Sequence, residues 1–399
     1  MTMVPRRLPH VVQISFFSDR DERRPAQLLD AWPTLVDVAE AACRSGARVS
    51  VVQASSHSEN FARHGVDYYF LPFGAGQRSG VNNAGLGGLL RAVAPDVFHV
   101  HGLGFPRDVL SLASLAPGIP ILLQDHASGP PRIWRRTLWR SEMSAAAGIA
   151  FCSLQQARPF VDARIMGPNT PLYEIPESTS RFVPGDRQEA RRRTGLEGDP
   201  AVLWVGHLDA NKDPLTVLQG ISAAARELPR LALYCCFGAA PLLRAVEERI
   251  ATDPHLRGRV HLLGQVSHER IEQLMRAADL FVLGSHREGS GYSLIEALAC
   301  GLPPVVTDIP SFRALTGAGT VGMLWPCGDP QALAEAIRSV AAGVGVGMRA
   351  AVRAHFDLEL SSESLGRKLA AMYEDTIGRQ RGSVASAPRL HAGTPMRVP

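Results

Sequence analysis

Short runs of Val, Ile and Leu alternate along the chain with longer stretches in which apolar residues recur at helical spacing. Such runs predict strands buried on both faces of a parallel sheet, and the stretches between them predict the covering helices. In the first half we expect strands near 11–17, 48–53, 97–101, 119–124 and 148–152. A helix is expected at 33–45, because a proline opens this stretch and Gly46 closes it.

The same alternation restarts after residue 200, with strands expected near 202–206, 231–237, 260–263, 280–283 and 304–307. Between the two halves, residues 168–200 are rich in proline and carry a charged run, so we place the domain connection there. The chain therefore predicts an α/β protein of two doubly wound, Rossmann-like domains. Ligands of such sheets bind beyond the carboxyl ends of the strands, which favours a site in a cleft between the domains.

The composition excludes several classes of protein. With 399 residues, 45% of them hydrophobic and 20% charged, the chain is neither disordered, collagen-like nor a polytopic membrane protein. A net charge of +4 is too small to indicate a nucleic-acid partner. Lys212 and Lys368 are the two lysines of the sequence, so almost all of the positive charge is arginine.

The cysteines and the apolar runs favour a cytoplasmic location. The six cysteines form no Cys-x-x-Cys pair and no spacing with histidine that indicates a disulfide framework or a zinc site. We expect no signal peptide, because polar residues interrupt the apolar stretch that follows Arg7. No run reaches the roughly 18 apolar residues that span a bilayer.

A glycine-rich turn with two acids follows the strand expected at 280–283. Glu288-Gly289-Ser290-Gly291-Tyr292 lies where a helix begins, and Glu296 lies further along that helix. Backbone amides at a helix N-terminus suit a phosphate, and the two carboxylates can accept hydrogen bonds from vicinal hydroxyls. The residues alone also fit a plain tight turn with an acid near the helix start.

This block resembles the Glu-x7-Glu motif of the retaining glycosyltransferases of family four, the group 1 glycosyl transferases, which have the two-domain GT-B fold. Glu288 and Glu296 fall at the two acids, and Leu-Ile-Glu-Ala-Leu-Ala-Cys-Gly-Leu-Pro at 294–303 matches the following helix. The resemblance implies that Glu288 holds hydroxyls of the donor sugar and Glu296 the nucleotide ribose. It also implies that the amides of 289–292 bind the sugar and its diphosphate. It covers most of the chain to about 376 and is strongest over 202–330.

A second motif lies at the end of the first strand of the second half. Gly206 and His207 precede Lys212 in a turn that leads into a helix. By position alone Lys212 is equally well a solvated surface lysine. The family has an arginine and a lysine here that meet the donor diphosphate; Lys212 matches and His207 departs. We hypothesise that bound diphosphate stabilises a protonated His207 ring. The resemblance also places base recognition near Val266.

Three histidines mark the first half. His99 and His101 lie two apart on one strand and project to the same face, whereas His126 follows the end of the next strand. The pair fits structural histidines better than a metal site, because no third ligand has suitable spacing. The resemblance implies that His99 and His101 line the cleft and that His126 contacts the donor sugar. The family's glycine turn after the first strand is absent, and a charged run stands at 18–25.

Arginines at 132, 136 and 140 share one face if this segment is helical, and Ile133, Trp134 and Leu138 lie beside them. Such a helix can lie on an anionic bilayer or receive a phosphate-bearing acceptor. An ordinary amphipathic helix with hydrated arginines fits the same pattern.

Together these features predict a cytoplasmic glycosyltransferase that moves a hexose-type sugar from a nucleoside diphosphate sugar to an acceptor hydroxyl. By resemblance it is retaining and needs no metal or other cofactor, with His126, Lys212 and Glu288 as its catalytic residues. The expected partners are the nucleotide sugar and a glycan, lipid-linked or small-molecule acceptor, with peripheral membrane contact through 132–140. The alternatives are an epimerase or phosphorylase of the same fold, and a catalytically silent nucleotide-sugar-binding protein. We expect domains at 1–180 and 181–360, a helix at 361–380 that returns to the first domain, and a disordered tail at 381–399.

Overall fold

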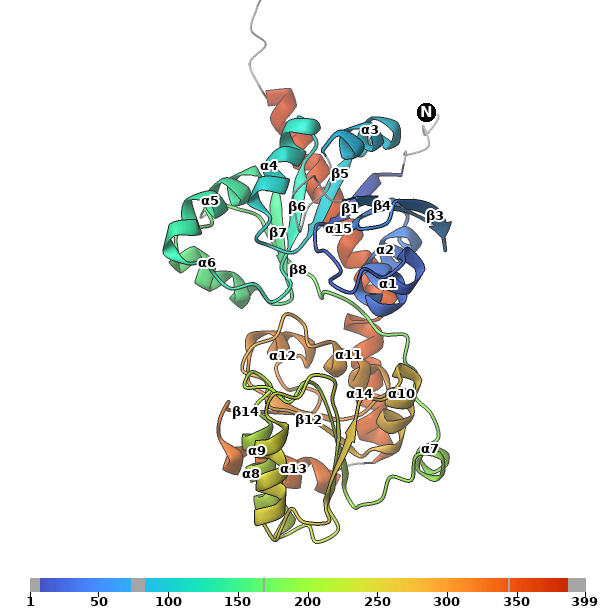
Figure 1. Cartoon of the computed structure of the whole chain (residues 1–399), viewed down its shortest axis with the longest axis vertical. Coiled ribbons are helices and arrows are strands. Elements are labelled where there is room, and N and C mark those ends of the chain that lie inside the picture. The colour runs from blue at the N-terminus through green and yellow to red at the C-terminus, as the bar shows by residue number, and fades with distance from the viewer. Residues whose placement is uncertain (1–7, 73–82, 168, 344, 387–399) are drawn as a thin grey trace, which may run out of the picture.

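Two β-sheets, one in each half of the chain, form the framework of the protein (Figure 1). The computed structural model describes residues 8–72, 83–167, 169–343 and 345–386. The first sheet has the strand order β3-β4-β2-β1-β5-β6-β7-β8; β3 is antiparallel to β4 and the other pairs are parallel. Its strands are β1 (His10–Ser15), β2 (Arg48–Ser55), β3 (Glu59–Arg63), β4 (Val66–Pro72), β5 (Val97–His101), β6 (Ile121–Gln124), β7 (Gly148–Phe151) and β8 (Leu172–Glu174).

The second sheet is parallel throughout, in the order β11-β10-β9-β12-β13-β14. Its strands are β9 (Ala201–Val205), β10 (Ala232–Cys236), β11 (Val260–Gly264), β12 (Leu280–Leu283), β13 (Pro304–Thr307) and β14 (Met323–Trp325). Each half has its own buried apolar core, so the predicted α/β fold of two Rossmann-like domains is confirmed.

Helices cover both sheets. The first half carries α1 (Pro25–Ala31), α2 (Pro33–Arg44), α3 (Asn83–Val93), α4 (Pro106–Leu115), α5 (Arg136–Ala145) and α6 (Arg158–Asp162), with the 3-10 turns η1 (Ile133–Arg135) and η2 (Leu154–Ala157). The second half carries α7 (Arg187–Thr194), α8 (Pro214–Ala225), α9 (Leu243–Thr252), α10 (His268–Ala277), α11 (Tyr292–Ala299), α12 (Pro310–Leu315), α13 (Pro330–Gly343), α14 (Val346–Glu359) and α15 (Ser362–Ser386).

All ten strands expected from the apolar runs are present, and four further strands were not predicted. β8 and β14 have three residues each, too short to give a periodic signal. β3 is a polar edge strand, joined to β4 by a tight turn in which His64 and Gly65 both have positive φ. Its polar side chains match a solvated edge rather than a buried strand.

The last helix, α15, starts in the second half and packs against α2 of the first (Figure 1). Leu369 and Tyr373 are fully buried in the first-half core. Close packing requires Gly366, because a Cβ there would lie 2.5 Å from the carbonyl oxygen of Ala41. The helix continues to Ser386, so residues 381–386 are helical where the composition predicted a disordered tail; extending a formed helix needs no new nucleation. The rest of that predicted tail, 387–399, lies outside the described residues.

In each sheet the strand order reverses beside the first strand, because β1 lies between β2 and β5 and β9 lies between β10 and β12. Loops that leave the carboxyl ends of two strands at such a point diverge and leave a crevice for a ligand. The loops after β9 and β12 carry Lys212 and Glu288, and the loop after β6 carries His126. The fold thus brings the sequence motifs to the edges of the sheets where ligands bind.

Candidate functional site

The two motifs of the second half meet in an ion pair. Lys212 Nζ contacts Glu288 Oε1, and both side chains are largely buried, at 15% and 13% exposed. Asn211 joins the two loops that carry the pair. Its side-chain amide donates to the Arg287 carbonyl at 2.9 Å, and its backbone carbonyl accepts from the His286 N–H at 2.8 Å. The sequence identified both residues but not their contact with each other.

The turn that follows Glu288 depends on its glycines. Gly291 precedes α11 with a φ of 82°, a conformation that favours glycine, and a Cβ there would lie 2.5 Å from the Phe312 ring. The turn directs the chain into α11 at Tyr292, where the first backbone N–H groups have no partner within the helix. Ser290 is buried, and burial raises the pKa of Tyr292.

His207 is exposed at the end of β9, next to Gly206, whose N–H donates to the Cys236 carbonyl at 3.1 Å. The ring Nδ1 of His207 accepts a hydrogen bond from the Ala239 N–H at 3.1 Å. In this tautomer the ring N–H lies on Nε2, which can donate one hydrogen bond to a ligand. The hypothesised protonation by bound diphosphate stays a prediction, and it would require the bond from Ala239 to open.

Glu296 is buried at 2% exposed, and one of its oxygens contacts Nε2 of His268 at the start of α10. Burial raises the pKa of Glu296, while the hydrogen bond from His268 acts in the opposite direction. A ribose in this position would have to share the Glu296 carboxylate with His268. His268 was not identified from the sequence. Val266 lies two residues before His268 and packs half-buried against the second core.

The three predicted histidines of the first half differ in their exposure. His99 is fully buried under Tyr373 of α15, at 2.9 Å between Nδ1 and the hydroxyl, so it does not line the cleft as expected. Its strand is covered by α15, which the local sequence does not reveal. His101 is also buried but reaches His126, with 3.2 Å between Nδ1 and Nε2. His126 is 22% exposed, and its Nδ1 lies 3.3 Å from Oε2 of Glu177.

His101 and His126 border a cavity of about 250 Å³ at the carboxyl ends of β1, β5 and β6. Its wall mixes apolar side chains with hydroxyls, which suits a sugar or a small acceptor. The other lining residues are Ser15, Phe17, Ser18, Trp32, Thr34 and Leu35. In the charged run beside it, Arg23 pairs with Asp19 at 2.7 Å and is thus engaged within the run itself.

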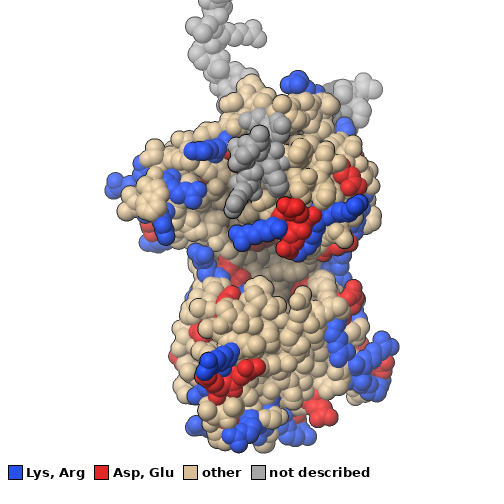
Figure 2. All heavy atoms as spheres, in the orientation of Figure 1, with Lys and Arg blue, Asp and Glu red and all other residues tan. Residues whose placement is uncertain are grey.

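A second cavity, of about 210 Å³, lies between the halves and is lined by residues 125, 127–130, 155–156 and 159–160 of the first and 286–288 and 309–311 of the second. Hydrogen bonds join the two halves beside this cavity. Gln156 donates to the carbonyls of Glu288 and Gly289 at 2.8 and 3.0 Å, and the Glu177 N–H donates to Ser290 Oγ at 2.9 Å. Figure 2 shows the corresponding hollow at the waist of the molecule. Gln156 and Glu177 were missed because neither lies in a recognisable motif.

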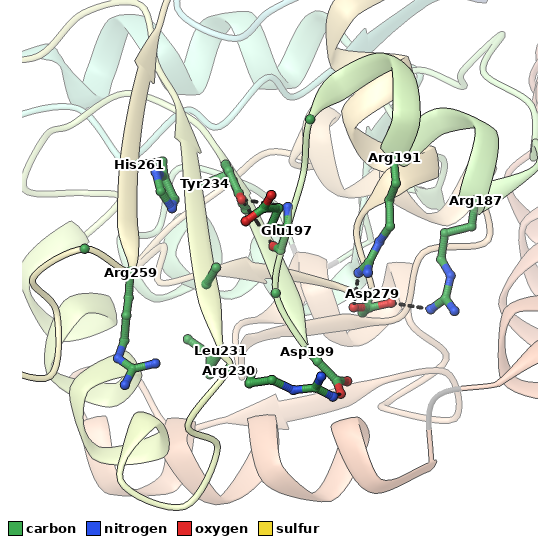
Figure 3. Close-up of a pocket in the computed structure, with 14 residues that line it drawn as sticks. Arg187, Arg191, Glu197, Asp199, Arg230, Leu231, Tyr234, Arg259, His261 and Asp279 are labelled. Atoms are coloured by element: carbon green, nitrogen blue, oxygen red, sulfur yellow. Dashed lines mark hydrogen bonds and ion pairs between the residues drawn. The ribbon is translucent and has the colours of Figure 1, made fainter.

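A larger pocket, of about 770 Å³, lies elsewhere (Figure 3). It is lined at the amino ends of β9 and β10, where Arg187 and Arg191 both point toward Asp279 and pair with it. Parallel sheets bind ligands at the other ends of their strands, so this pocket is not the candidate site.

The arginine-rich segment forms two elements. η1 holds residues 133–135 and α5 begins at Arg136, so Arg132 lies outside the helix and does not share its face as expected. Ile133 and Trp134 are 77% and 72% exposed, and the Arg132 guanidinium lies 5.3 Å from the centre of the Trp134 ring. Basic side chains gather over this part of the surface in Figure 2.

Among the residues that the structure describes, no three His, Cys, Asp or Glu side chains form a group that could hold a metal ion. Within the same ranges, each helix is too short or too polar to cross a bilayer.

Comparison with known proteins gives two family matches. Residues 186–344 match the model described as glycosyl transferases group 1, and residues 33–165 match glycosyltransferase family 4. A GDP-mannose:cellobiosyl-diphosphopolyprenol alpha-mannosyltransferase of Xanthomonas campestris is 28% identical over 260 residues, 62% of this chain and 64% of that protein. A D-inositol 3-phosphate glycosyltransferase of Geodermatophilus obscurus is 31% identical over 241 residues, 57% of this chain. The alignments thus span 64% and 53% of the length of these relatives.

Solved structures share the fold at low sequence identity. Sucrose-phosphate synthase of Thermosynechococcus elongatus superposes with a TM-score of 0.70 at 18% identity, covering 93% of this chain and 100% of that one. Anabaena HepE in complex with UDP gives 0.68 at 17% identity, covering 92% and 100%.

Proposed function

The chain belongs to the family 4 glycosyltransferases, the group 1 glycosyl transferases, and on that premise we propose that it transfers a hexose-type sugar from a nucleoside diphosphate sugar to an acceptor hydroxyl, with retention. One observation carries the proposal: the buried Lys212–Glu288 pair lies where the strand order of the second sheet reverses. The glycine turn beside it adjoins Glu177, which pairs with His126 of the first half.

In the proposed reaction, the diphosphate competes with Glu288 for the ammonium of Lys212. A phosphate carries more negative charge than a carboxylate, and the partly buried position strengthens the attraction. Glu288, released from Lys212, then accepts hydrogen bonds from hydroxyls of the sugar. As the diphosphate departs, positive charge develops at the anomeric carbon, and donors fixed on the leaving group stabilise the transition state.

Transfer without a metal is part of the proposal. Lys212, the Nε2–H of His207 and the first amides of α11 are the donors that would offset the charge of the leaving diphosphate. Retention follows in this proposal from attack on the same face of the sugar, assisted by the leaving phosphate.

The acceptor and the location are proposed from the surface. The exposed Ile133 and Trp134 beside arginines favour an acceptor carried by a membrane, and one relative is named for a diphosphopolyprenol acceptor. All six cysteines are free, which supports the reducing cytoplasm as the compartment.

Thermal unfolding with a panel of nucleotide sugars tests the proposal first, because a donor that binds the native state raises the melting temperature without any acceptor. Release of nucleoside diphosphate that requires acceptor then supports transfer. Interconversion of sugars in the donor alone would favour an epimerase, and release that requires phosphate a phosphorylase. Donor binding without turnover across a broad acceptor panel would favour a silent binding protein.

A further inference from the structure

Glu177 lies in the segment that leaves β8 and crosses to the second half (Figure 1). Its N–H donates to Ser290 at 2.9 Å, and its Oε2 lies 3.3 Å from His126 Nδ1. The other oxygen, Oε1, lies against Gly289: a Cβ on that glycine would be only 1.7 Å from it. The carboxylate therefore occupies the space between the histidine and the turn that the proposed function assigns to the donor sugar.

The hydrogen bonds of His101 determine which of the two neighbouring rings, His101 or His126, donates to the other. Gln13 donates through Nε2 to Tyr373, so its Oε1 faces His101 Nε2 at 3.4 Å and accepts from it. Burial lowers the pKa of His101 well below its usual value, so this ring is neutral and its Nδ1 has no proton. His101 Nδ1 must then accept from His126 Nε2, 3.2 Å away.

The second ring nitrogen of His126 faces Glu177. Its Nδ1 lies 3.3 Å from Oε2 of the Glu177 carboxylate. The histidine ring and the turn at Gly289 therefore flank the carboxylate on two sides.

The free oxygen of Glu177 needs a donor. Oε1 is buried and has no hydrogen-bond partner within the ranges that the structure describes. A buried carboxylate oxygen without a donor is costly, and a hydroxyl satisfies it well.

We propose that Glu177 is a specificity-determining residue of the donor site: its carboxylate, held beside His126 and the turn at Gly289, accepts a hydrogen bond from a hydroxyl of the transferred sugar. This rests on the proposed function for the identity of the ligand.

Calorimetric binding tests the sugar contact, with UDP-glucose, GDP-mannose, UDP and GDP as probes. Glu177→Gln should weaken binding of the nucleotide sugar about tenfold or more and leave binding of the matching nucleoside diphosphate unchanged. Glu177→Asp should recover part of the loss. Equal losses for sugar and diphosphate, or no loss for either, would contradict the contact. Glu174→Gln, an exposed carboxylate three residues earlier, is the control and should bind the probes as the wild type does. If the wild type binds none of the four probes, the proposed function fails for these donors, whereas equal binding of a nucleotide sugar by the wild type and Glu177→Gln overturns the contact alone.

Discussion

Glu296 and His268 form a hydrogen bond between the start of α10 and the buried side of α11. The carboxylate is 3% exposed and the histidine 53% exposed, so only one member of the pair reaches solvent. The hydrogen bond raises the pKa of His268, and burial raises that of Glu296. Both groups thus hold a proton more strongly in the folded chain than in the unfolded one.

This pair predicts a stability that falls as pH rises. A raised folded pKa means that the contribution of His268 is complete below about pH 6.5 and is lost as the pH rises through the folded value. The melting temperature of the wild type should exceed that of His268→Gln by a few degrees near pH 6, and the difference should shrink toward pH 8.5. Differential scanning calorimetry across this range measures it. His261→Gln, an exposed histidine on β11, is the control, and a constant difference for His268→Gln would refute the assignment.

The two lysines give a matched pair for the donor site. Lys212 pairs with Glu288, whereas Lys368 donates to the Glu359 carbonyl at 2.9 Å and to its carboxylate at 3.1 Å, on α14 and α15. Lys212→Gln removes a charged donor to the diphosphate and should weaken nucleoside diphosphate binding about tenfold to a hundredfold. Calorimetry with UDP and GDP measures the change.

Lys368→Gln removes the same charge elsewhere and should leave these affinities unchanged. If both substitutions weaken binding equally, the effect is one of net charge and Lys212 has no special role. An unaltered affinity in Lys212→Gln would place the diphosphate elsewhere.

Gly289 is expected to be coupled to Glu177. A Cβ at 289 would lie 1.7 Å from Glu177 Oε1, so Gly289→Ala must displace the carboxylate from His126. We expect Gly289→Ala to destabilise the protein by about 1–3 kcal/mol, as overpacking does. In the Glu177→Ala background the same change should cost less than about 0.5 kcal/mol. Urea unfolding of the four proteins gives the coupling, and additive effects would show that Gly289 and Glu177 do not contact each other.

The sequence predicted the parts of this molecule that depend on neighbouring residues. Ten of the strands follow from apolar runs, and Lys212 and Glu288 were found because their local motifs resemble those of the family. The fold brings the ends of β9 and β12 together, and the resulting contact between the two side chains was not predicted.

The parts that were missed depend on residues far apart in the chain. Glu177 lies in a connecting segment without periodic pattern and meets Ser290 across 113 positions. His268 pairs with Glu296 across 28 positions, and nothing around it distinguishes it from an ordinary helix-start residue. His99 was assigned to the cleft by resemblance to the family, but α15 returns across 274 positions to cover it. Such contacts follow from tertiary packing, which no local pattern encodes.

The surface around η1 and α5 predicts binding to anionic membranes. Ile133 and Trp134 are exposed beside Arg132, Arg135 and Arg140, so apolar insertion and charge attraction act together. The wild type should sediment with vesicles that contain phosphatidylglycerol, far less with neutral phosphatidylcholine, and less as salt is added. The triple variant Arg132→Ser, Arg136→Ser, Arg140→Ser should lose most of this binding.

The triple variant Arg192→Ser, Arg193→Ser, Arg244→Ser separates this local effect from net charge. These three arginines lie in the second half, away from η1 and α5, and are 67%, 64% and 92% exposed. It changes the total charge by the same amount and should bind vesicles as the wild type does. Trp134→Ser should weaken binding with its arginines intact, since the ring supplies the apolar contact. Equal binding by all four proteins would mean that this surface does not contact lipid.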